Sequence, residues 1–467
     1  TSNNKIKIGG DLKYSLNSSL NLDATINPDF SQAEVDQQVT NLDRFELFFP
    51  ERRQFFLENG DLFSNFGYKT IRPFFSRRIG LGVPIQAGVR LSGNIDENWR
   101  IGLMNIQTRS DDILNTAAEN FGVVSLQRKV FDRSNVSLIF INKQAVKLNE
   151  NQINQSQYNR NIGLEYNYFS ADNLWNSKLM FLKSLSPIKK KQGEVFASHI
   201  EYQSTRWKWK LQQEYITGNY SAEVGFIPRN NYIKIQATVG HLTYTKKNTS
   251  LLSHGPSIER TYYFDTDFNK KDQTEQFDYL FNFKNRSRFS IGIRRQYIEL
   301  LSDFDPLRTN ISSLFAGSTH QWNSYKIKYN SKPQNRFTYS TELLTGGYYE
   351  KGKRTAFLGE FGYRFQPILE LNSVINYNQI ELPAPWNENS FWLLGLKANL
   401  TLTNKIFFSN LFQYNEQLGL WNFNSRFQWR YKPASDMFLV FNSNEIIVPK
   451  VSRGWSLTLK VNYWLNL

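Results

Sequence analysis

Hydrophobic and polar side chains alternate along most of this chain, in segments of about ten to thirteen residues. Residues 421–431 read WNFNSRFQWRY, with aromatic side chains at most odd positions and polar or charged ones at every even position. Successive side chains of a strand point to opposite faces, so this segment has one apolar and one polar face. About ten residues tilted by about 45° cross the hydrocarbon layer of a membrane. More than about twenty such segments predict a closed transmembrane β-barrel, because only a closed sheet satisfies every backbone group in lipid.

The clearest predicted strands place aromatic and aliphatic residues on the outward face. They span residues 6–16, 20–26, 207–215, 277–283, 289–297, 357–365 and 457–465. Short turns are predicted at 132–135, 171–173, 332–335, 403–404 and 432–435. Longer polar loops are predicted near 144–157, 186–193, 218–231, 301–319, 347–354, 381–390 and 446–454. Outer-membrane barrels have short periplasmic turns and long extracellular loops, which assigns the short set to the periplasm.

The predicted fold is all-β: a large antiparallel transmembrane β-barrel of about 22–24 strands with an internal plug-like insertion. Residues 1–467 form one barrel domain, placed in the outer membrane of a Gram-negative bacterium. The pattern itself gives about 23 strands, whereas a single-chain bacterial barrel has an even number. We therefore expect either a strand that precedes Thr1 or one more strand near residues 68–79.

Residues 28–84 break the alternation and mix aromatic residues with charges of both signs. We predict that this segment folds into the lumen as a plug or constriction, because a barrel this wide is otherwise an open pore. Arg side chains bind carboxylates through two parallel hydrogen bonds, which suits confined ion pairs. The predicted ion network comprises Asp29, Glu46, Glu51, Arg52, Arg53, Glu58, Arg77 and Arg78.

Three roles are open for this network. It could pin a folded segment to the barrel wall, because buried ion networks are often structural. It could instead form a gate or a solute site. A catalytic carboxylate pair is the third role, although no histidine or metal motif accompanies these acids.

Three stretches of the same region carry a resemblance: NPDFSQ at 27–32, FFPERRQFFLE at 48–58 and FFSRRIG at 74–80. They resemble the barrel domain of a Bacteroidota outer-membrane family of unknown function. Members of that family usually carry an N-terminal family-nine-type carbohydrate-binding domain. The given sequence starts at the barrel, so we expect it to be the barrel portion of a longer protein. The resemblance is specific over residues 8–82 and implies a location and a link to carbohydrate, but no catalytic residues.

On hydropathy alone the chain looks soluble, but a transmembrane barrel escapes that test because its inward residues are polar. The mean hydropathy is −0.52 and no run of eighteen apolar residues occurs, so no membrane helix is predicted. Aromatic residues make up 15% of the chain, as girdles at two membrane interfaces require, and there is no cysteine. The net charge is +15, but the basic residues are scattered, which favours a basic lumen and lipopolysaccharide-facing loops over nucleic-acid binding.

Motifs for known chemistry are absent from the sequence. The four histidines, His199, His241, His254 and His320, have no zinc spacing, and no nucleophile elbow, phosphate loop or dinucleotide fingerprint occurs. Residues 265–269 imitate a calcium loop, but Lys270 stands where glycine is needed. We therefore expect no metal, no cofactor and no enzymatic activity.

Basic residues on the polar phase of several strands are a better lead, because basic rings favour anionic solutes. They are Lys208, Lys210, Arg294, Lys326, Lys328, Arg426 and Arg430. Acidic residues such as Glu201, Glu214 and Glu360 share that face, and any polar side chain suits a wet lumen, so the implied selectivity is weak.

The favoured function is a gated or plugged channel for solutes, with glycan fragments as candidates. The alternatives are a non-conducting anchor or scaffold with outer-membrane or periplasmic protein partners, and an outer-membrane hydrolase. The hydrolase would need a Ser or Asp placed with a His at the barrel rim, and the sequence reveals no such set. Energy-coupled uptake with a separate N-terminal plug domain is disfavoured, because the candidate plug is short and follows the second strand.

Overall fold

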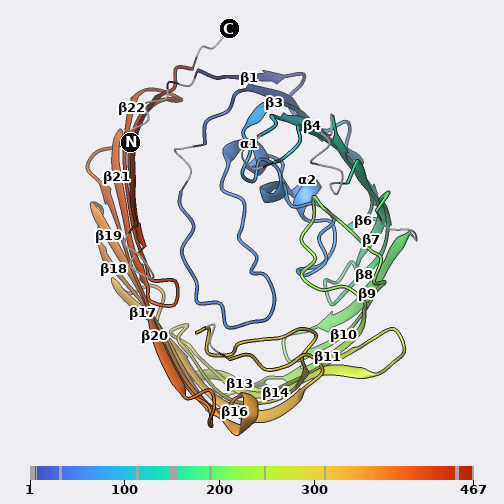
Figure 1. Ribbon diagram of the computed structural model, residues 1–467, viewed down its shortest axis with the longest axis vertical. Helices are drawn as coiled ribbons and strands as arrows, with labels where there is room; N and C mark the ends of the chain where they lie inside the picture. Colours follow the sequence, from blue (N-terminus) through green and yellow to red (C-terminus); the bar gives the residue numbers. More distant parts are fainter. Residues whose placement is uncertain are drawn as a thin grey trace.

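A computed structural model describes residues 6, 8–30, 34–111, 115–146, 156–188, 192–246, 249–309, 312–446 and 452–464. Within these ranges nearly all of the regular secondary structure is β-strand, and Figure 1 shows the strands arranged as a ring around an interior segment. The strands are β1 (Gly10–Ser15), β2 (Leu20–Ile26), β3 (Ile85–Asn94), β4 (Trp99–Thr108), β5 (Glu119–Val130), β6 (Ser134–Ala145), β7 (Tyr158–Phe169), β8 (Trp175–Leu185), β9 (Gly193–Gln203), β10 (Trp207–Ile216), β11 (Tyr232–His241), β12 (Thr243–Tyr244), β13 (Leu251–Phe264), β14 (Lys270–Phe283), β15 (Arg288–Glu299), β16 (Thr319–Asn330), β17 (Phe337–Gly347), β18 (Lys353–Phe365), β19 (Leu369–Glu381), β20 (Glu388–Thr401), β21 (Ile406–Asn415), β22 (Leu420–Lys432), β23 (Ser435–Ile446) and β24 (Ser452–Val461).

The 24 strands form one antiparallel sheet, which confirms the predicted fold class. Strands β11 and β12 both pair with β13, so they are two parts of one crossing interrupted at Leu242. Gly255 of β13 permits this interruption, because a Cβ there would lie 1.9 Å from the His241 carbonyl oxygen. Among the described residues no ladder joins β1 to β24.

The longest connections lie at one end of the strands and the predicted short turns at the other. The turns at 132–135, 171–173, 332–335, 403–404 and 432–435 each join two neighbouring strands of the sheet. The loops between β10 and β11, β15 and β16, and β17 and β18 lie at the opposite end, which we call the long-loop end. Parts of the predicted loops, including 147–155 and 447–451, and the predicted end of the last strand at Leu465 lie outside the described residues.

The outward face carries the apolar residues that the pattern assigned to it. On β10, Trp209 and Leu211 are 48% and 41% exposed, while Gln212 and Glu214 on the other face are buried. A monomeric water-soluble protein rarely exposes contiguous apolar surface on this scale, whereas a lipid-facing barrel wall requires it.

The inward face is not polar throughout, which corrects the expectation of a hydrated lumen. On β6, Ile139 and Ile141 are 0% and 1% exposed on the inward face, while Phe140 between them faces outward. These strands are apolar on both faces because residues of the interior segment cover the inner one. The resulting first apolar cluster includes Phe56, Phe63, Phe66, Ile71, Met104, Ile106, Ile139, Ile141, Met180 and Leu182.

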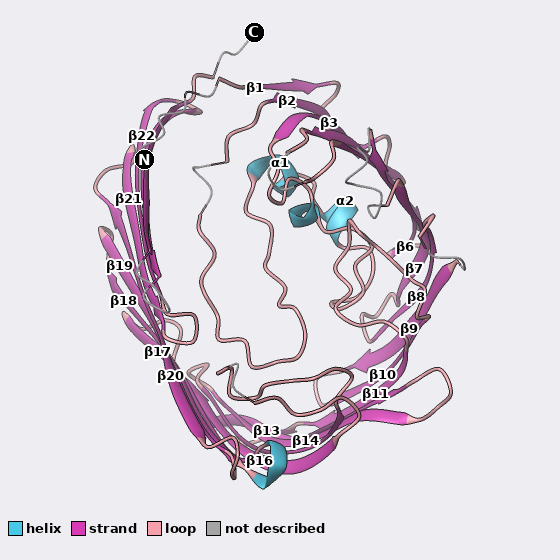
Figure 2. Ribbon diagram, viewed as in Figure 1, coloured by secondary structure: helices cyan, strands magenta, loops and turns pink. Residues whose placement is uncertain are grey.

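The interior segment is the connection between β2 and β3, which pair with each other in the sheet. It contains the short helices α1 (Gln54–Leu57) and α2 (Asp61–Ser64) and the 3-10 turn η1 (Ser76–Arg78). Figure 2 shows both helices inside the ring of strands. No strand forms at 68–79 within the described chain, so that expectation was wrong: Tyr68 and Ile71 make an isolated bridge inside the segment.

We divide the described part of this connection in two. Residues 54–79, the anchor, lie against strands β3 to β10 and contribute to the first apolar cluster. Residues 34–50, the strap, run across the interior and return to α1 (Figure 1). In the part of the chain that the structure describes, no helix is long and apolar enough to span a bilayer.

Candidate functional site

The anchor is fixed to the wall by aromatic rings that pack on glycines. The Phe63 ring lies where a side chain at Gly102 of β4 would be, since a Cβ there would meet ring carbons at 2.7 and 2.9 Å. The Phe66 ring lies over Gly163 of β7 in the same way, at 2.9 and 3.0 Å. Each wall glycine therefore provides the space that one anchor ring occupies.

Hydrogen bonds and an ion pair also hold the anchor against the wall. The Gly67 backbone N–H donates to Glu165 Oε2 at 2.7 Å, and Lys178 Nζ donates to the Gly67 carbonyl oxygen at 2.8 Å. Lys178 and Glu165 also form an ion pair at 3.0 Å. The Ser125 hydroxyl donates to the Leu62 carbonyl oxygen at 2.6 Å. These bonds satisfy backbone groups of the anchor that would otherwise be buried without partners.

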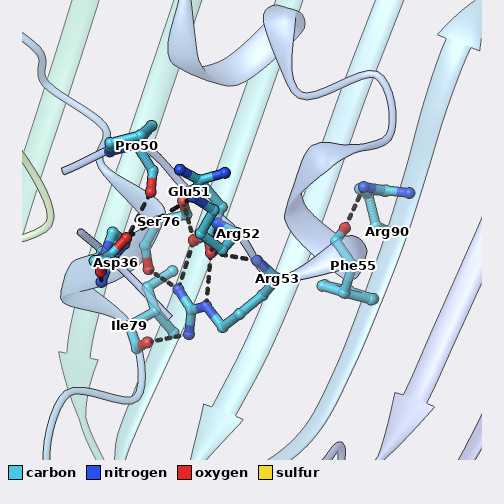
Figure 3. Close-up of polar contacts among 10 residues, drawn as sticks. Asp36, Pro50, Glu51, Arg52, Arg53, Phe55, Ser76, Ile79 and Arg90 are labelled. Atoms are coloured by element: carbon cyan, nitrogen blue, oxygen red, sulfur yellow. Dashed lines mark hydrogen bonds and ion pairs between the residues drawn. The ribbon is translucent and has the colours of Figure 1, made fainter. Parts of the chain in front are cut away.

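Glu51 and Arg53 form the centre of a clamp at the base of the anchor (Figure 3). The Arg53 guanidinium donates to both Glu51 carboxylate oxygens, to the Ser76 carbonyl oxygen at 2.7 Å and to the Ile79 carbonyl oxygen at 2.8 Å. The Ser76 hydroxyl donates to Glu51 Oε2 at 2.6 Å. The Phe56 ring lies under the guanidinium, 4.3 Å from its central carbon. The clamp thus ties residues 51–53 to the turn at 76–79.

The Glu51 carboxylate is held in its charged form. Burial opposes that charge, but the hydrogen bonds from Arg53 and Ser76 outweigh it and lower the pKa of Glu51 below its ordinary value. Glu51 Oε1 also accepts the backbone N–H groups of Arg52 and Arg53, both at 2.8 Å. Its two oxygens are therefore occupied by donors of the fold, which favours a structural over a catalytic role.

Arg77 joins the clamp to the strap. It binds the Asp36 carboxylate through two guanidinium nitrogens and donates to the Pro50 carbonyl oxygen at 2.8 Å. Arg52 lies 3.8 Å from Glu34 and 3.9 Å from Asp36. Of the predicted residues, Glu51, Arg52, Arg53 and Arg77 therefore gather at one place.

The other predicted residues lie apart from this centre. Glu46 pairs with Arg78 at 2.5 Å, and Arg78 also donates to the Gly225 carbonyl oxygen. Glu58 pairs with Lys13 of β1 and lies 3.8 Å from the buried Arg90 of β3. The Asp29 carbonyl oxygen accepts a hydrogen bond from Lys460 of β24. The predicted set is thus four separate groups along the insertion.

The strap meets the opposite wall mainly through charged and polar contacts. Glu34 lies 3.2 Å from Lys397 of β20 and 3.8 Å from Arg426 of β22. The Asn41 carbonyl oxygen accepts from Gln417 at 3.0 Å, and the Asp43 carbonyl oxygen accepts from Arg308. Leu42 adds an apolar contact, because it packs against a second apolar cluster that includes Phe304, Trp322 and Tyr349.

Asp272 of β14 holds the far turn of the strap. It lies 3.0 Å from Arg44 and also pairs with Arg229. Arg44 extends further and donates to the Glu299 carbonyl oxygen at 3.1 Å.

Glu34 is held ionised by its basic neighbours. Burial opposes the charge, but the hydrogen bond from Lys397 and the nearby charges of Lys397, Arg426 and Arg52 lower the pKa of Glu34. The pH must therefore fall below the ordinary pKa of a glutamate before Glu34 is protonated and these ion pairs lose their negative partner.

Each predicted basic residue of the lumen has an acidic or amide neighbour. Lys208 and Lys210 lie 3.6 and 4.0 Å from Glu201, and Arg294 donates to Gln276. The remaining pairs are Lys326 with Asp278, Lys328 with Glu342, Arg426 with Glu34, and Arg430 with Asp436. Anion selectivity by this set therefore stays a prediction.

No group of side chains within the described ranges is arranged to hold a metal ion. His199 contacts Tyr68 and Asn176 at 3.1 Å each, and His254 contacts Tyr279 at 2.6 Å. His241 packs on Trp207, with ring centroids 4.4 Å apart.

The comparisons with known proteins support the architecture. Among solved structures, the siderophore receptor PirA from Pseudomonas aeruginosa is similar over 81% of this chain and 76% of its own, with 8% identity and a TM-score of 0.50. The fold of this chain, a large antiparallel β-barrel, is similar to the barrel of that receptor. The ferric-catecholate import receptor Fiu from E. coli K12, in its open form, is similar over 82% of this chain and 73% of its own, with 8% identity and a TM-score of 0.45.

One family model matches the first part of the chain, and its description states no activity. Residues 1–98 of this barrel match a family described as Domain of unknown function (DUF5916). This region includes residues 8–82, where the resemblance to an uncharacterised family was specific. No curated protein matches the chain.

The predicted network omitted the acids that hold the strap. Glu34 and Asp36 are close in sequence to the NPDFSQ stretch. Asp36 pairs with Arg77 of the same insertion, whereas the wall partners of Glu34, Lys397 and Arg426, are far along the chain. The excess of acidic residues in 28–50, five against one base, was the available signal. Pairing Glu34 with bases on β20 and β22 required the three-dimensional register.

Proposed function

We propose that the protein is an outer-membrane channel in which the strap acts as the gate and the anchor is a fixed support. The observation that carries this proposal is the contrast between the two halves of the insertion. The anchor is held by a dry apolar cluster with rings seated on wall glycines, whereas the strap crosses to the far wall mainly on ion pairs and hydrogen bonds. Ion pairs in a wet lumen exchange readily with water, so the strap is the half that can move.

The wall around the strap carries charges of both signs, which suits a polar solute. We propose glycan fragments as that solute. The support is the resemblance of residues 8–82 to a Bacteroidota family whose members usually carry a carbohydrate-binding domain. The alternating basic and acidic lumen residues, such as Lys326 with Asp278, give a polar path without a strong preference for one charge.

The test is conductance of the purified full chain in planar bilayers. Replacing Glu34 with Gln removes the charge that faces Lys397, Arg426 and Arg52, so we expect larger or more frequent openings. The matched control is Glu342→Gln, which breaks an ion pair of 3.0 Å with Lys328 that does not involve the strap. If both variants conduct like the wild type, the proposal that the strap acts as a gate is contradicted.

Liposome swelling tests the solute. Vesicles that contain the Glu34→Gln variant should swell in maltooligosaccharides up to a size limit, and the wild type should swell more slowly. Swelling with salts but not with any oligosaccharide contradicts the glycan proposal and leaves the channel in place.

A second function is favoured by the apolar cluster itself. A dry core between anchor and wall is costly to open, which suits a permanently filled barrel that serves as a membrane scaffold. Deleting residues 35–47 separates the two functions. A variant that folds but never conducts favours the scaffold, and stoichiometric partners should then co-purify with it.

A further inference from the structure

Three side chains with complementary chemistry converge at the long-loop end of the barrel. The Ser318 hydroxyl oxygen lies 2.9 Å from His320 Nε2, and His320 Nδ1 lies 3.2 Å from Glu350 Oε1. A nucleophile within hydrogen-bond reach of a base, with the base oriented by a third group, is the geometry of a catalytic triad.

The local fold explains how the three residues meet. Ser318 directly precedes β16 (Thr319–Asn330) and His320 is its second residue, so an extended backbone turns both side chains to the same face. Glu350 comes from η3 (Tyr349–Lys351), in the connection between β17 and β18. Its φ of 50° and ψ of 37° lie in the left-handed region, which glutamate seldom adopts and which recurs at functional sites.

The histidine is held firmly and the other two residues are accessible. The His320 side chain is 3% exposed and packs edge-on against the Tyr349 ring, with centroids 5.1 Å apart. Ser318 is half-buried, and the Glu350 side chain is 38% exposed. Next to the serine, Gly317 leaves open space, because a Cβ there would meet no atom within 4 Å.

Proton placement decides whether the set can react. A Glu350 carboxylate that accepts a hydrogen bond from His320 Nδ1–H leaves Nε2 with a free lone pair, which then accepts the Ser318 hydroxyl proton. The same hydroxyl lies 2.7 Å from the Phe315 carbonyl oxygen, so it has two acceptors and one proton. Rotation of the hydroxyl from Phe315 to His320 prepares the serine for attack.

We propose that Ser318, His320 and Glu350 form a serine-esterase site at the mouth of the lumen, acting on carboxylic esters. Ser318 Oγ attacks the ester carbonyl carbon while its proton passes to His320 Nε2. The alcohol leaves with that proton, and an acyl ester remains on Ser318. Water then attacks the carbonyl carbon of this ester and gives one proton to His320 Nε2. His320 passes that proton to Ser318 Oγ as the carbon–oxygen bond to the serine breaks, which releases the acid and the free serine. Glu350 keeps the Nδ1 proton in place throughout.

The other histidines provide a contrast within the same barrel. His199 and His254 contact tyrosine or asparagine side chains, and His241 packs against a tryptophan. His320 is the one placed between a hydroxyl and a carboxylate in the described chain. A histidine with a purely structural role does not need a serine hydroxyl on one ring nitrogen and a carboxylate on the other.

The experiment uses the purified full chain in detergent, treated with a fluorophosphonate that forms a covalent bond to activated serines and releases fluoride. We expect one label, on the peptide that contains Ser318. The Ser318→Ala variant should lose it, and His320→Gln should label about 100-fold more slowly, because a general base contributes about 10²–10⁴ in rate. Hydrolysis of p-nitrophenyl acetate should fall in parallel.

Two variants keep the result interpretable. Ser313→Ala changes an exposed serine of the same loop and should label at the wild-type rate. Glu350→Gln changes a partly exposed side chain and should slow labelling even if His320→Gln does not fold, as judged by its heat-dependent mobility on gels. A wild type that takes no label, or His320→Gln and Glu350→Gln variants that label as fast as the wild type, overturns the proposal.

The esterase test is independent of the channel test. The conductance of Ser318→Ala should equal that of the wild type, so failure of one proposal leaves the other in place.

Discussion

At the residue scale, the side chain of one arginine, Arg53, makes several hydrogen bonds at once. Arg53 binds Glu51 through two nitrogens and also donates to two carbonyl oxygens of the turn at 76–79. A lysine has a single ammonium group and cannot present this planar fork. The geometry of the clamp therefore depends on arginine and not only on a positive charge.

We predict that Arg53→Lys loosens the anchor by about 1–3 kcal/mol, because two buried carbonyl oxygens lose their donors. Hydrogen–deuterium exchange of residues 54–79 should become faster, while exchange in β13 to β20 stays the same. Arg133→Lys, in the exposed turn between β5 and β6, is the control and should leave exchange unchanged. Unchanged exchange in both variants would show that the clamp is dispensable.

The pH dependence of the strap follows from Glu34. Its pKa is lowered, so the ion pairs that it makes stabilise the closed strap above the ordinary value of 4.5. This stability is lost as the pH falls through the lowered pKa. We predict that wild-type conductance is constant at neutral pH and rises only below about pH 4.5, and that Glu34→Gln removes most of this rise. An acid response of the same size in Glu34→Gln would assign the effect to other groups.

At the element scale, the wall strands and the insertion are fitted to each other. Gly102 of β4 and Gly163 of β7 face the rings of Phe63 and Phe66, and the neighbouring inward residues are apolar. The same strands keep apolar residues on the outward face, so they depart from simple alternation where the anchor covers them. This departure marks the docking surface on the wall.

We predict that Gly102→Ala displaces the Phe63 ring and weakens docking of the anchor by about 1–3 kcal/mol, the usual cost of overpacking. Limited proteolysis should then cut near Arg52 and Arg53 at lower protease concentration. Gly122→Ala is the matched control, because its new Cβ would have only the Asn105 side chain nearby, at 3.9 Å. Equal protection of both variants would mean that the ring moves aside without cost.

At the scale of the whole molecule, the two ends of the barrel differ. Short turns gather at one end, and the long loops and the proposed esterase site lie at the other, while the insertion runs from the long-loop end into the interior. By the usual rule for outer-membrane barrels the long-loop end is extracellular. We expect this orientation to place Ser318 on the side where solutes arrive.

We predict that a cysteine introduced at Ala316, in a long loop, reacts with a membrane-impermeant maleimide on intact cells. A cysteine at Ala171, in a short turn, should react only after the outer membrane is permeabilised. Both positions are exposed alanines and the chain has no native cysteine, so each signal comes from one site. Reaction of both cysteines on intact cells, or the reverse order, contradicts the orientation.

The sequence by itself determined the sheet. Alternation in 207–215 and 421–431 requires one face in lipid and one face inward, and the strands form where the pattern places them. Turn positions followed for the same reason, because the pattern is local and each strand pairs with its neighbour in sequence.

Only the tertiary structure decided what lies within the ring. A strand was predicted near residues 68–79, but the conformation of this segment is set by its contacts within the anchor. The apolar inward face of β6 is explained only by the anchor, whose residues Phe63 and Phe66 cover this side of the barrel. The partners Glu34 and Lys397, and the group of Ser318, His320 and Glu350, come together through strand register and loop folding. Such contacts join residues far apart in the chain, and no local pattern encodes which of many charged or polar residues will meet.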